Sequence, residues 1–113
     1  MIETQVIQYL ETKLNVPVYA EDPTEDVAEY IVLEMIDGGR IEHIDAVTFN
    51  IESISTSMLK AADLNERVRS TMFGIIEIPN ISASRCGGGG QNIDRSKKAH
   101  RFECVFNLFY TEE

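Results

Sequence analysis

Alternating apolar positions near the end of the sequence predict a long β-strand over Ala99–Tyr110. Successive side chains of a strand point to opposite faces of a sheet, so every second residue shares one face. The apolar face of this strand consists of Phe102, Cys104, Phe106, Leu108 and Tyr110. A strand of about a dozen residues is longer than most. We therefore expect it inside an antiparallel sheet, with neighbours on both sides and helices over its apolar face.

Two stretches repeat apolar residues at intervals of three and four, which is the spacing of an amphipathic helix. The first predicts a helix over Ile2–Leu14 that ends at Asn15, and the second predicts a longer helix over Ser57–Phe73. Ser57 is one of several candidate N-caps, and Gly74 is a candidate C-cap. Each helix has one apolar face, which we expect to lie on the sheet.

Period-two alternation predicts further strands. They are Val16–Ala20, Glu29–Ile36, a strand within Arg40–Ser53, and a weak strand over Asn80–Cys86. Pro17 cannot donate a ladder hydrogen bond, so the first strand belongs at a sheet edge or a strand start. Asp37-Gly38-Gly39 predicts the turn between the second and third strands, because glycine adopts positive φ without steric cost. The segment Arg40–Ile44 fits the alternation less well and can equally belong to a long hairpin loop.

Four successive glycines, Gly87–Gly90, predict a mobile loop over residues 87–98 that joins the last two strands. Glycine loses the most backbone entropy on ordering, and long loops in compact domains are usually functional or disordered. The order of elements contains no βαβ repeat, and 113 residues suit one domain. We predict a single α+β domain over residues 1–113. It has a mainly antiparallel sheet of four to five strands and two helices packed on one face.

The formal net charge of −9 argues against a general nucleic-acid-binding surface. The charge is uneven. Residues 1–34 contain eight acidic residues and one basic residue, whereas residues 85–101 contain five basic residues and one acidic residue. No apolar run approaches the roughly 20 residues of a membrane helix. The first residues lack the basic and apolar parts of a secretory signal, so we expect neither a membrane span nor a signal.

The uneven charge suggests contacts between copies of the chain. The candidate acidic contacts are Glu21, Asp22, Glu25, Asp26 and Glu29. The candidate basic contacts are Arg95, Lys97, Lys98 and Arg101. Complementary patches at different places on one surface favour head-to-tail contacts, which make rings or filaments. Solvated loops are the alternative for both segments.

The residues that commonly carry chemistry do not form a known motif. Cys86 and Cys104 are too few for a disulfide framework, and we expect both to be free thiols. His43 and His100 are the only histidines, and neither lies in a nucleophile signature. The spacing of Cys86, His100 and Cys104 lacks the paired cysteines of a structural zinc site. The glycine tract Gly87–Gly90 lacks the P-loop pattern, so we predict no catalytic residue, metal or cofactor.

Six segments together resemble a known family. They are Val16–Glu21, Glu29–Glu34, Asp45–Ile51, Ala61–Asn65, Arg101–Phe106 and Asn107–Tyr110. In their order they resemble the tail terminator proteins, minor tail (tail-completion) proteins of bacteriophages with long, non-contractile tails. The resemblance covers most of the chain.

The resemblance implies a structural protein that is not an enzyme and that forms a ring, a hexamer, on the completed tail tube. Such a ring stops tube polymerisation and presents a surface for head joining. The expected partners are copies of the chain, the tail tube protein and the head connector proteins. The expected location is the tail or neck of the virion, after synthesis in the cytoplasm of the host bacterium.

Two alternatives stay open from the sequence. The chain can be a head-completion or connector-side adaptor protein of the same particle. It can also be a small cytoplasmic enzyme or regulator in which His43 acts with Cys86 or His100. The second alternative predicts a concave pocket containing a histidine with a shifted pKa.

Overall fold

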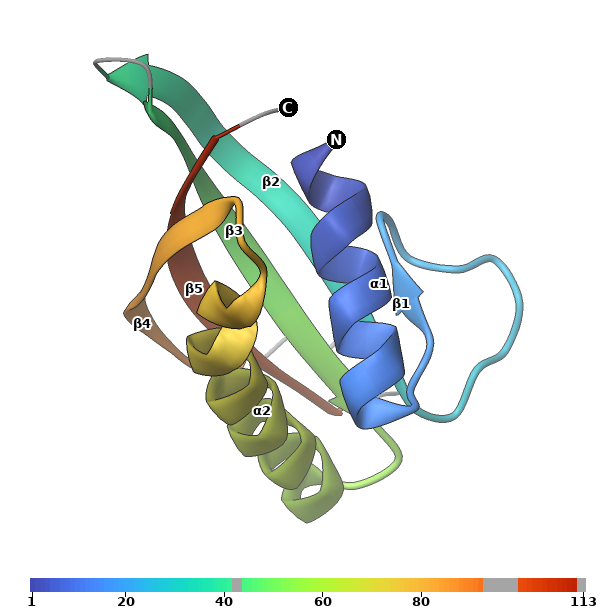
Figure 1. Cartoon of the computed structure of the whole chain (residues 1–113). Helices are drawn as coiled ribbons and strands as arrows, with labels where there is room; N and C mark the ends of the chain where they lie inside the picture. The colour runs from blue at the N-terminus through green and yellow to red at the C-terminus, as the bar shows by residue number, and fades with distance from the viewer. Residues whose placement is uncertain (42–43, 93–99, 112–113) are drawn as a thin grey trace.

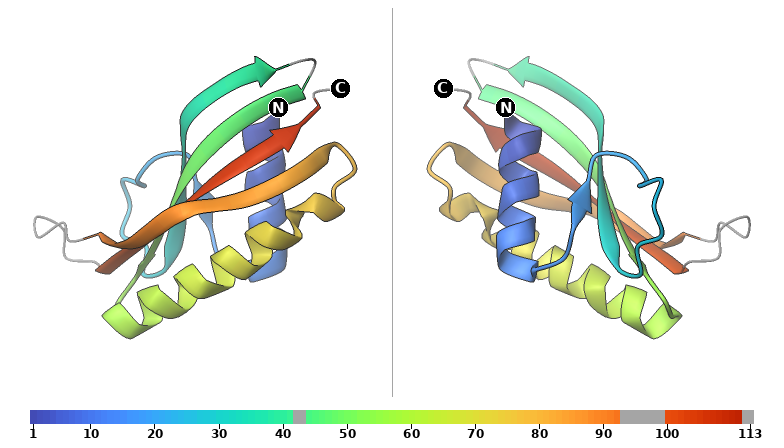
Figure 2. Two further views of the ribbon diagram at one scale, coloured as in Figure 1. Left: turned by 90° about the vertical axis from the view of Figure 1, so that its left-hand side faces the viewer. Right: turned by 90° about the vertical axis from the view of Figure 1, so that its right-hand side faces the viewer.

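Two helices cover one face of a five-stranded sheet in the computed structural model, which describes residues 1–41, 44–92 and 100–111 (Figures 1 and 2). The elements, in chain order, are α1 Ile2–Leu14, β1 Val18–Tyr19, β2 Tyr30–Ile41, β3 Ile44–Ser55, α2 Met58–Phe73, the 3₁₀ helix η1 Gly74–Glu77, β4 Ile81–Asn92 and β5 His100–Tyr110. The α+β fold predicted from the sequence is confirmed.

The strands lie in the order β1-β2-β3-β5-β4. β1 runs parallel to β2, and the other three pairings are antiparallel. The predicted long strand is β5, which lies between β3 and β4 and has a neighbour on each side, as expected. The proline-containing strand is β1, and it lies at the edge of the sheet.

Local sequence signals explain where the helices begin and end. Asn15 ends α1 in the left-handed region with φ 56°, and its N–H donates to the Glu11 carbonyl. Asparagine tolerates this conformation better than most residues. The Ser57 side chain caps α2 by accepting a hydrogen bond from the Lys60 N–H at 3.2 Å. Gly74 follows α2, and the chain continues into η1.

The main core lies between the helices and one face of the sheet. The predicted apolar face of β5 supplies Cys104, Phe106 and Leu108, which are buried there. The ring of Phe73 packs edge to face on Phe106, with centroids 5.2 Å apart. A smaller cluster lies on the opposite face, hereafter the outer face, and it consists of Tyr30, Val32, Ile54, Tyr19 and Val27.

The predicted turn at Asp37-Gly38-Gly39 is wrong. These three residues lie inside β2 and pair with Thr48, Val47 and Ala46 of β3. A register shift, or β-bulge, lies between Met35 and Asp37. Beyond it the two glycines remain paired with β3, and the chain does not reverse there. The strand continues to Ile41, and residues 42–43 lie outside the described residues.

The predicted mobile loop over residues 87–98 is wrong in its first half. Gly87–Gly90 lie inside β4, which pairs with β5 as far as Asn92. Gly88 and Gly89 have φ values of 129° and 146°, beside a register shift between Cys86 and Gly88. A Cβ atom at Gly89 would overlap the backbone of Glu103, so close backbone approach explains this glycine. Residues 93–98 lie outside the described residues.

The molecule is elongated, with principal extents of 44 × 24 × 24 Å. The hairpin of β2 and β3 extends past both helices at one end, at the upper left of Figure 1. Among the described residues, no helix is long and apolar enough to cross a membrane.

Candidate functional site

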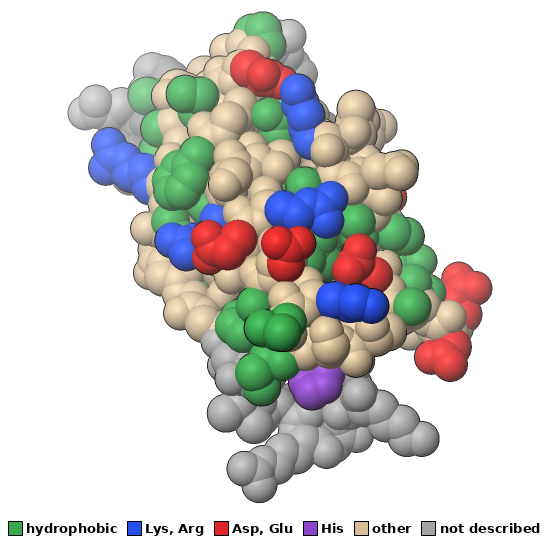
Figure 3. Space-filling view, turned by 90° about the horizontal axis from the view of Figure 1, so that it is seen from below, with side chains coloured by type: hydrophobic (Ala, Val, Ile, Leu, Met, Phe, Trp, Pro, Cys, Tyr) green, Lys and Arg blue, Asp and Glu red, His purple; other side chains and the backbone are tan. Residues whose placement is uncertain are grey.

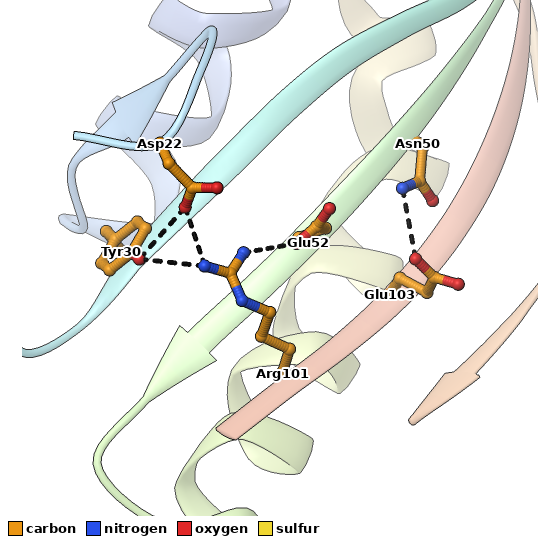
Figure 4. A network of polar contacts seen from close by, with 6 residues as sticks. All are labelled: Asp22, Tyr30, Asn50, Glu52, Arg101 and Glu103. Carbon is orange, nitrogen blue, oxygen red and sulfur yellow. Dashed lines mark hydrogen bonds and ion pairs between the residues drawn. The ribbon is translucent and has the colours of Figure 1, made fainter. Parts of the chain in front are cut away.

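The chain between β1 and β2, residues 20–29, carries the predicted acidic contacts and is called the acidic segment below. An ion-pair network on the outer face holds this segment against the sheet (Figure 4). Arg101 of β5 is only 4% exposed. Its Nη2 lies 2.8 Å from Asp22 Oδ1, and its Nη1 lies 2.5 Å from Glu52 Oε2. The Tyr30 hydroxyl donates to the same Asp22 oxygen at 3.3 Å. Asp22, in the segment between β1 and β2, is therefore bonded to β2 and β5, and Arg101 links this contact to Glu52 of β3.

The electrostatics of Arg101 follow from these contacts. Burial by itself lowers the pKa of the guanidinium, because it penalises the charged form. The hydrogen bonds and charges of Asp22 and Glu52 outweigh this effect and raise the pKa above its ordinary value. Arg101 therefore stays charged. A buried cation needs such partners to keep its charge.

The predicted contact residues are in different environments. Asp22 and Arg101, both predicted to contact other copies, pair with each other within one chain. Glu29 is half-buried and accepts a hydrogen bond from the Ser55 hydroxyl at 3.0 Å. The exposed members of the acidic set are Glu21, Asp22, Glu25 and Asp26. Arg95, Lys97 and Lys98 lie outside the described residues, so their predicted contact stays a prediction.

Cys86 lines a cavity of about 330 Å³ between α2 and the paired strands β4 and β5. Asn65 and Arg69 of α2 line the same cavity. The described residues around this cavity include no histidine. His100 is exposed at the start of β5, and His43 lies outside the described residues.

The two cysteines are free in the structure and differ in exposure. Cys86 is half-buried, whereas Cys104 is 1% exposed. Burial, followed by the neighbouring Cys86, raises the pKa of the Cys104 thiol to about 12. Cys104 therefore behaves as a small apolar core residue. Within residues 1–41, 44–92 and 100–111, no three His, Cys, Asp or Glu side chains are grouped to hold a metal ion.

One open edge of the sheet belongs to β2. β1 pairs only with Ile31 and Val32. From Leu33 onward, no strand of the described chain pairs with the edge of β2 that faces away from β3. Met35 and Ile36 are 51% and 57% exposed beside this edge. Beyond Val32, β2 is therefore an edge strand of the described sheet, although β1 and β3 flank it nearer its start.

Among the described strands, β4 is the last in the sheet, and its outward side is the other open edge. η1 and the end of α2 pack against β4. Phe73 and Ile76, from these two elements, are 48% and 53% exposed. The sequence reasoning missed this pair, because Phe73 and Ile76 lie at the end of an apolar periodicity that predicts burial.

The surface seen from below mixes acidic and basic side chains instead of separating the two signs (Figure 3). Hydrophobic side chains gather beside the histidine in the same view. At this end of the molecule α2 begins, and its second residue, Leu59, is 83% exposed. The described side chains of this face do not present the single-sign field that would attract a nucleic-acid backbone.

No protein-family model matches the chain, and no curated protein matches its sequence. The candidate site therefore rests on the geometry: two open sheet edges, each beside exposed apolar side chains, and an acidic segment fixed by Arg101.

Proposed function

We propose that the chain is a structural subunit that joins copies of itself into a ring and caps the tail tube of a long-tailed bacteriophage. One observation carries the proposal: large apolar side chains stand exposed beside both open edges of the sheet, at Met35 and Ile36 and at Phe73 and Ile76. Exposed apolar groups of this kind mark interaction sites on small proteins.

The two edges differ, and this favours a ring. A contact between unlike surfaces is heterologous, and it makes a closed ring when the rotation between copies closes. The exposed acidic residues Glu21, Glu25 and Asp26 lie in the segment after β1, beside one edge. The basic residues Arg95, Lys97 and Lys98 follow β4, the strand at the other edge. Charge attraction between neighbouring copies would guide the same head-to-tail arrangement.

The role in a phage tail comes from the family resemblance of the sequence. A ring on the last layer of the tail tube would stop polymerisation and offer its free face to the head connector proteins. The partners are then copies of the chain, the tail tube protein and the connector. The site of action is the neck of the virion.

Mass measurement tests the assembly. We expect native mass spectrometry and light scattering to detect a ring, a hexamer by the resemblance, alone or after addition of tail tube protein. Rising salt should weaken the ring, because it screens the charged contacts. A chain that stays monomeric in every condition, with and without tube protein, would reject the proposal.

Electron microscopy of labelled virions separates this proposal from its nearest alternative. A label at the end of the tail tube supports tail capping. A label on the connector side of the neck would assign the chain to head completion instead.

A further inference from the structure

We infer that neighbouring copies join edge to edge, with the open part of β2 in one copy paired to β4 of the next. The inference rests on the proposed function and deepens it, because it names the contact between copies. The partner is a second copy of this chain, and the sheet continues from one copy into the other.

The open part of β2 is suited to accept a strand. It runs from Leu33 to Ile41 and contains no proline or lysine, but it carries two acidic residues, Glu34 and Asp37, and a register shift between Met35 and Asp37. Beyond this shift, Asp37–Ile41 pairs with β3 in unbroken register, so this stretch is the regular part of the edge that can accept a strand. Gly38 and Gly39 have no side chains, so a neighbouring strand can approach the backbone closely at these two positions. The outward-facing peptide groups of this segment have no strand partner among the described residues.

The β4 edge offers one regular stretch for pairing. Register shifts lie between Ile81 and Ala83 and between Cys86 and Gly88. Ala83, Ser84, Arg85 and Cys86 pair in unbroken register with β5 between these shifts. An incoming strand therefore has a defined segment of β4 to match.

The strand directions fit antiparallel pairing. The chain of antiparallel contacts from β2 to β3, β5 and β4 leaves β4 running opposite to β2. Copies in the same orientation thus bring their β2 and β4 edges together antiparallel. This is the pairing already used in three of the four contacts of the sheet.

One row of paired residues crosses the sheet on the outer face and ends in opposite charges. Asp37 pairs with Thr48, Thr48 with Asn107, and Asn107 with Arg85. Thr48 Oγ1 and Asn107 Oδ1 are 2.7 Å apart in the middle of this row. Asp37 and Arg85 are both exposed at its two ends. In a continued sheet, Arg85 of one copy would stand beside Asp37 of the next, where opposite charges stabilise a strand pair.

The adjacent row, on the helix-covered face, is apolar from edge to edge. Met35 pairs with Phe49, Phe49 with Phe106, and Phe106 with Cys86. Phe73 rests on Phe106 near the β4 end of this row. Edge-to-edge joining would therefore cover the exposed Met35 of one copy with the Cys86 and Phe73 region of the next. Both rows end in groups that complement each other, charge with charge and apolar with apolar.

Charge reversal tests the contact. Asp37→Arg and Arg85→Asp should each raise the dissociation constant of the assembly about tenfold or more, since each places like charges together. The double variant exchanges the two charges and should recover most of the affinity. Asp63→Arg, on the exposed side of α2, makes the same charge change away from both edges and should have no effect. Circular dichroism and thermal melting of each variant confirm that it is folded.

The outcomes separate this inference from the proposed function. Loss in the single variants with recovery in the double variant supports the edge contact. Assembly that is unchanged in folded single variants overturns the edge contact and leaves the ring itself intact. Loss without recovery also overturns the pairing of Asp37 with Arg85. An unaltered chain that never assembles overturns both proposals.

Discussion

Arg101 and Asp22 lie 79 residues apart in the sequence and form an ion pair of 2.8 Å in the structure. The pair joins the fifth strand of the sheet to the acidic segment that follows the first. Arg101 also contacts Glu52, so one buried cation neutralises two carboxylates from different elements. The acidic segment is therefore held in one place on the domain, although Glu21, Glu25 and Asp26 within it are exposed.

Removing the guanidinium should destabilise the domain. We expect Arg101→Met to lower the free energy of unfolding by about 2–3 kcal/mol, because Glu52 is left without its charged hydrogen-bond donor at 16% exposure. Asp22→Asn should cost less than about 1 kcal/mol, because Asp22 is 41% exposed and water can replace the contact. Urea unfolding measures both values. Equal losses in the two variants would contradict the buried role of Glu52.

Gly89 should tolerate substitution far less than Gly90. A Cβ atom at Gly89 would lie 2.7 Å from Cys104 Cα, and the φ of 146° disfavours any side chain. We expect Gly89→Ala to lower the free energy of unfolding by about 2 kcal/mol or more. At Gly90 a Cβ atom meets nothing within 4 Å, so Gly90→Ala should be nearly neutral or slightly stabilising. Thermal or urea unfolding of the matched pair makes the comparison, and similar melting of both variants would refute it.

Alkaline pH should weaken the fold through Cys104. The pKa of its thiol is about 12 in the folded protein, against an ordinary value of 9.0. A raised folded pKa means that the contribution of this thiol is complete below pH 9 and is lost as pH rises toward 12. We expect the loss between pH 9 and pH 11 to be roughly 2 kcal/mol. The measurement is urea unfolding at several pH values, with Cys104→Ala as the control that should lack this component.

A disulfide should trap the proposed contact between copies. Asp37→Cys and Arg85→Cys are prepared in separate chains that also carry Cys86→Ser, and the two are mixed under mild oxidation. Directly paired strand residues have Cβ atoms about 4.5–5.5 Å apart, close to the distance that a disulfide bridges. We expect a covalent dimer linked between positions 37 and 85, identified by mass spectrometry of the joined peptides. Asp63→Cys in place of Asp37→Cys should give no such dimer.

The sequence predicted the elements whose signals are local. The helix bounds followed from apolar spacing and from Asn15 and Ser57, and both caps are in the structure. β5 was predicted from alternation, because Cys104, Phe106 and Leu108 on one face are buried while the residues between them, on the other face, are partly exposed. Such signals depend only on neighbouring residues, which a sequence displays directly.

The two errors share one cause. Asp37-Gly38-Gly39 and Gly87–Gly90 were both interpreted as chain reversals or loops, and both lie inside strands. Glycine permits a turn but does not require one, and the ladder with a neighbouring strand decides the outcome. That neighbour, β3 or β5, lies many residues away in the chain. The Arg101 network and the two rows that end in Asp37 and Arg85 also depend on register between distant strands, so no local pattern revealed them.

In the proposed contact between copies, the two-residue strand β1 would limit how a neighbouring strand can pair with β2. Strands rich in glycine define their register poorly and allow a partner to slide. β1 already pairs with β2 at Ile31 and Val32. A strand added to the open edge of β2 therefore cannot shift toward the start of β2 beyond Leu33. A strand of two residues would thereby restrict the register in which a strand of the neighbouring copy can pair with the 12-residue β2.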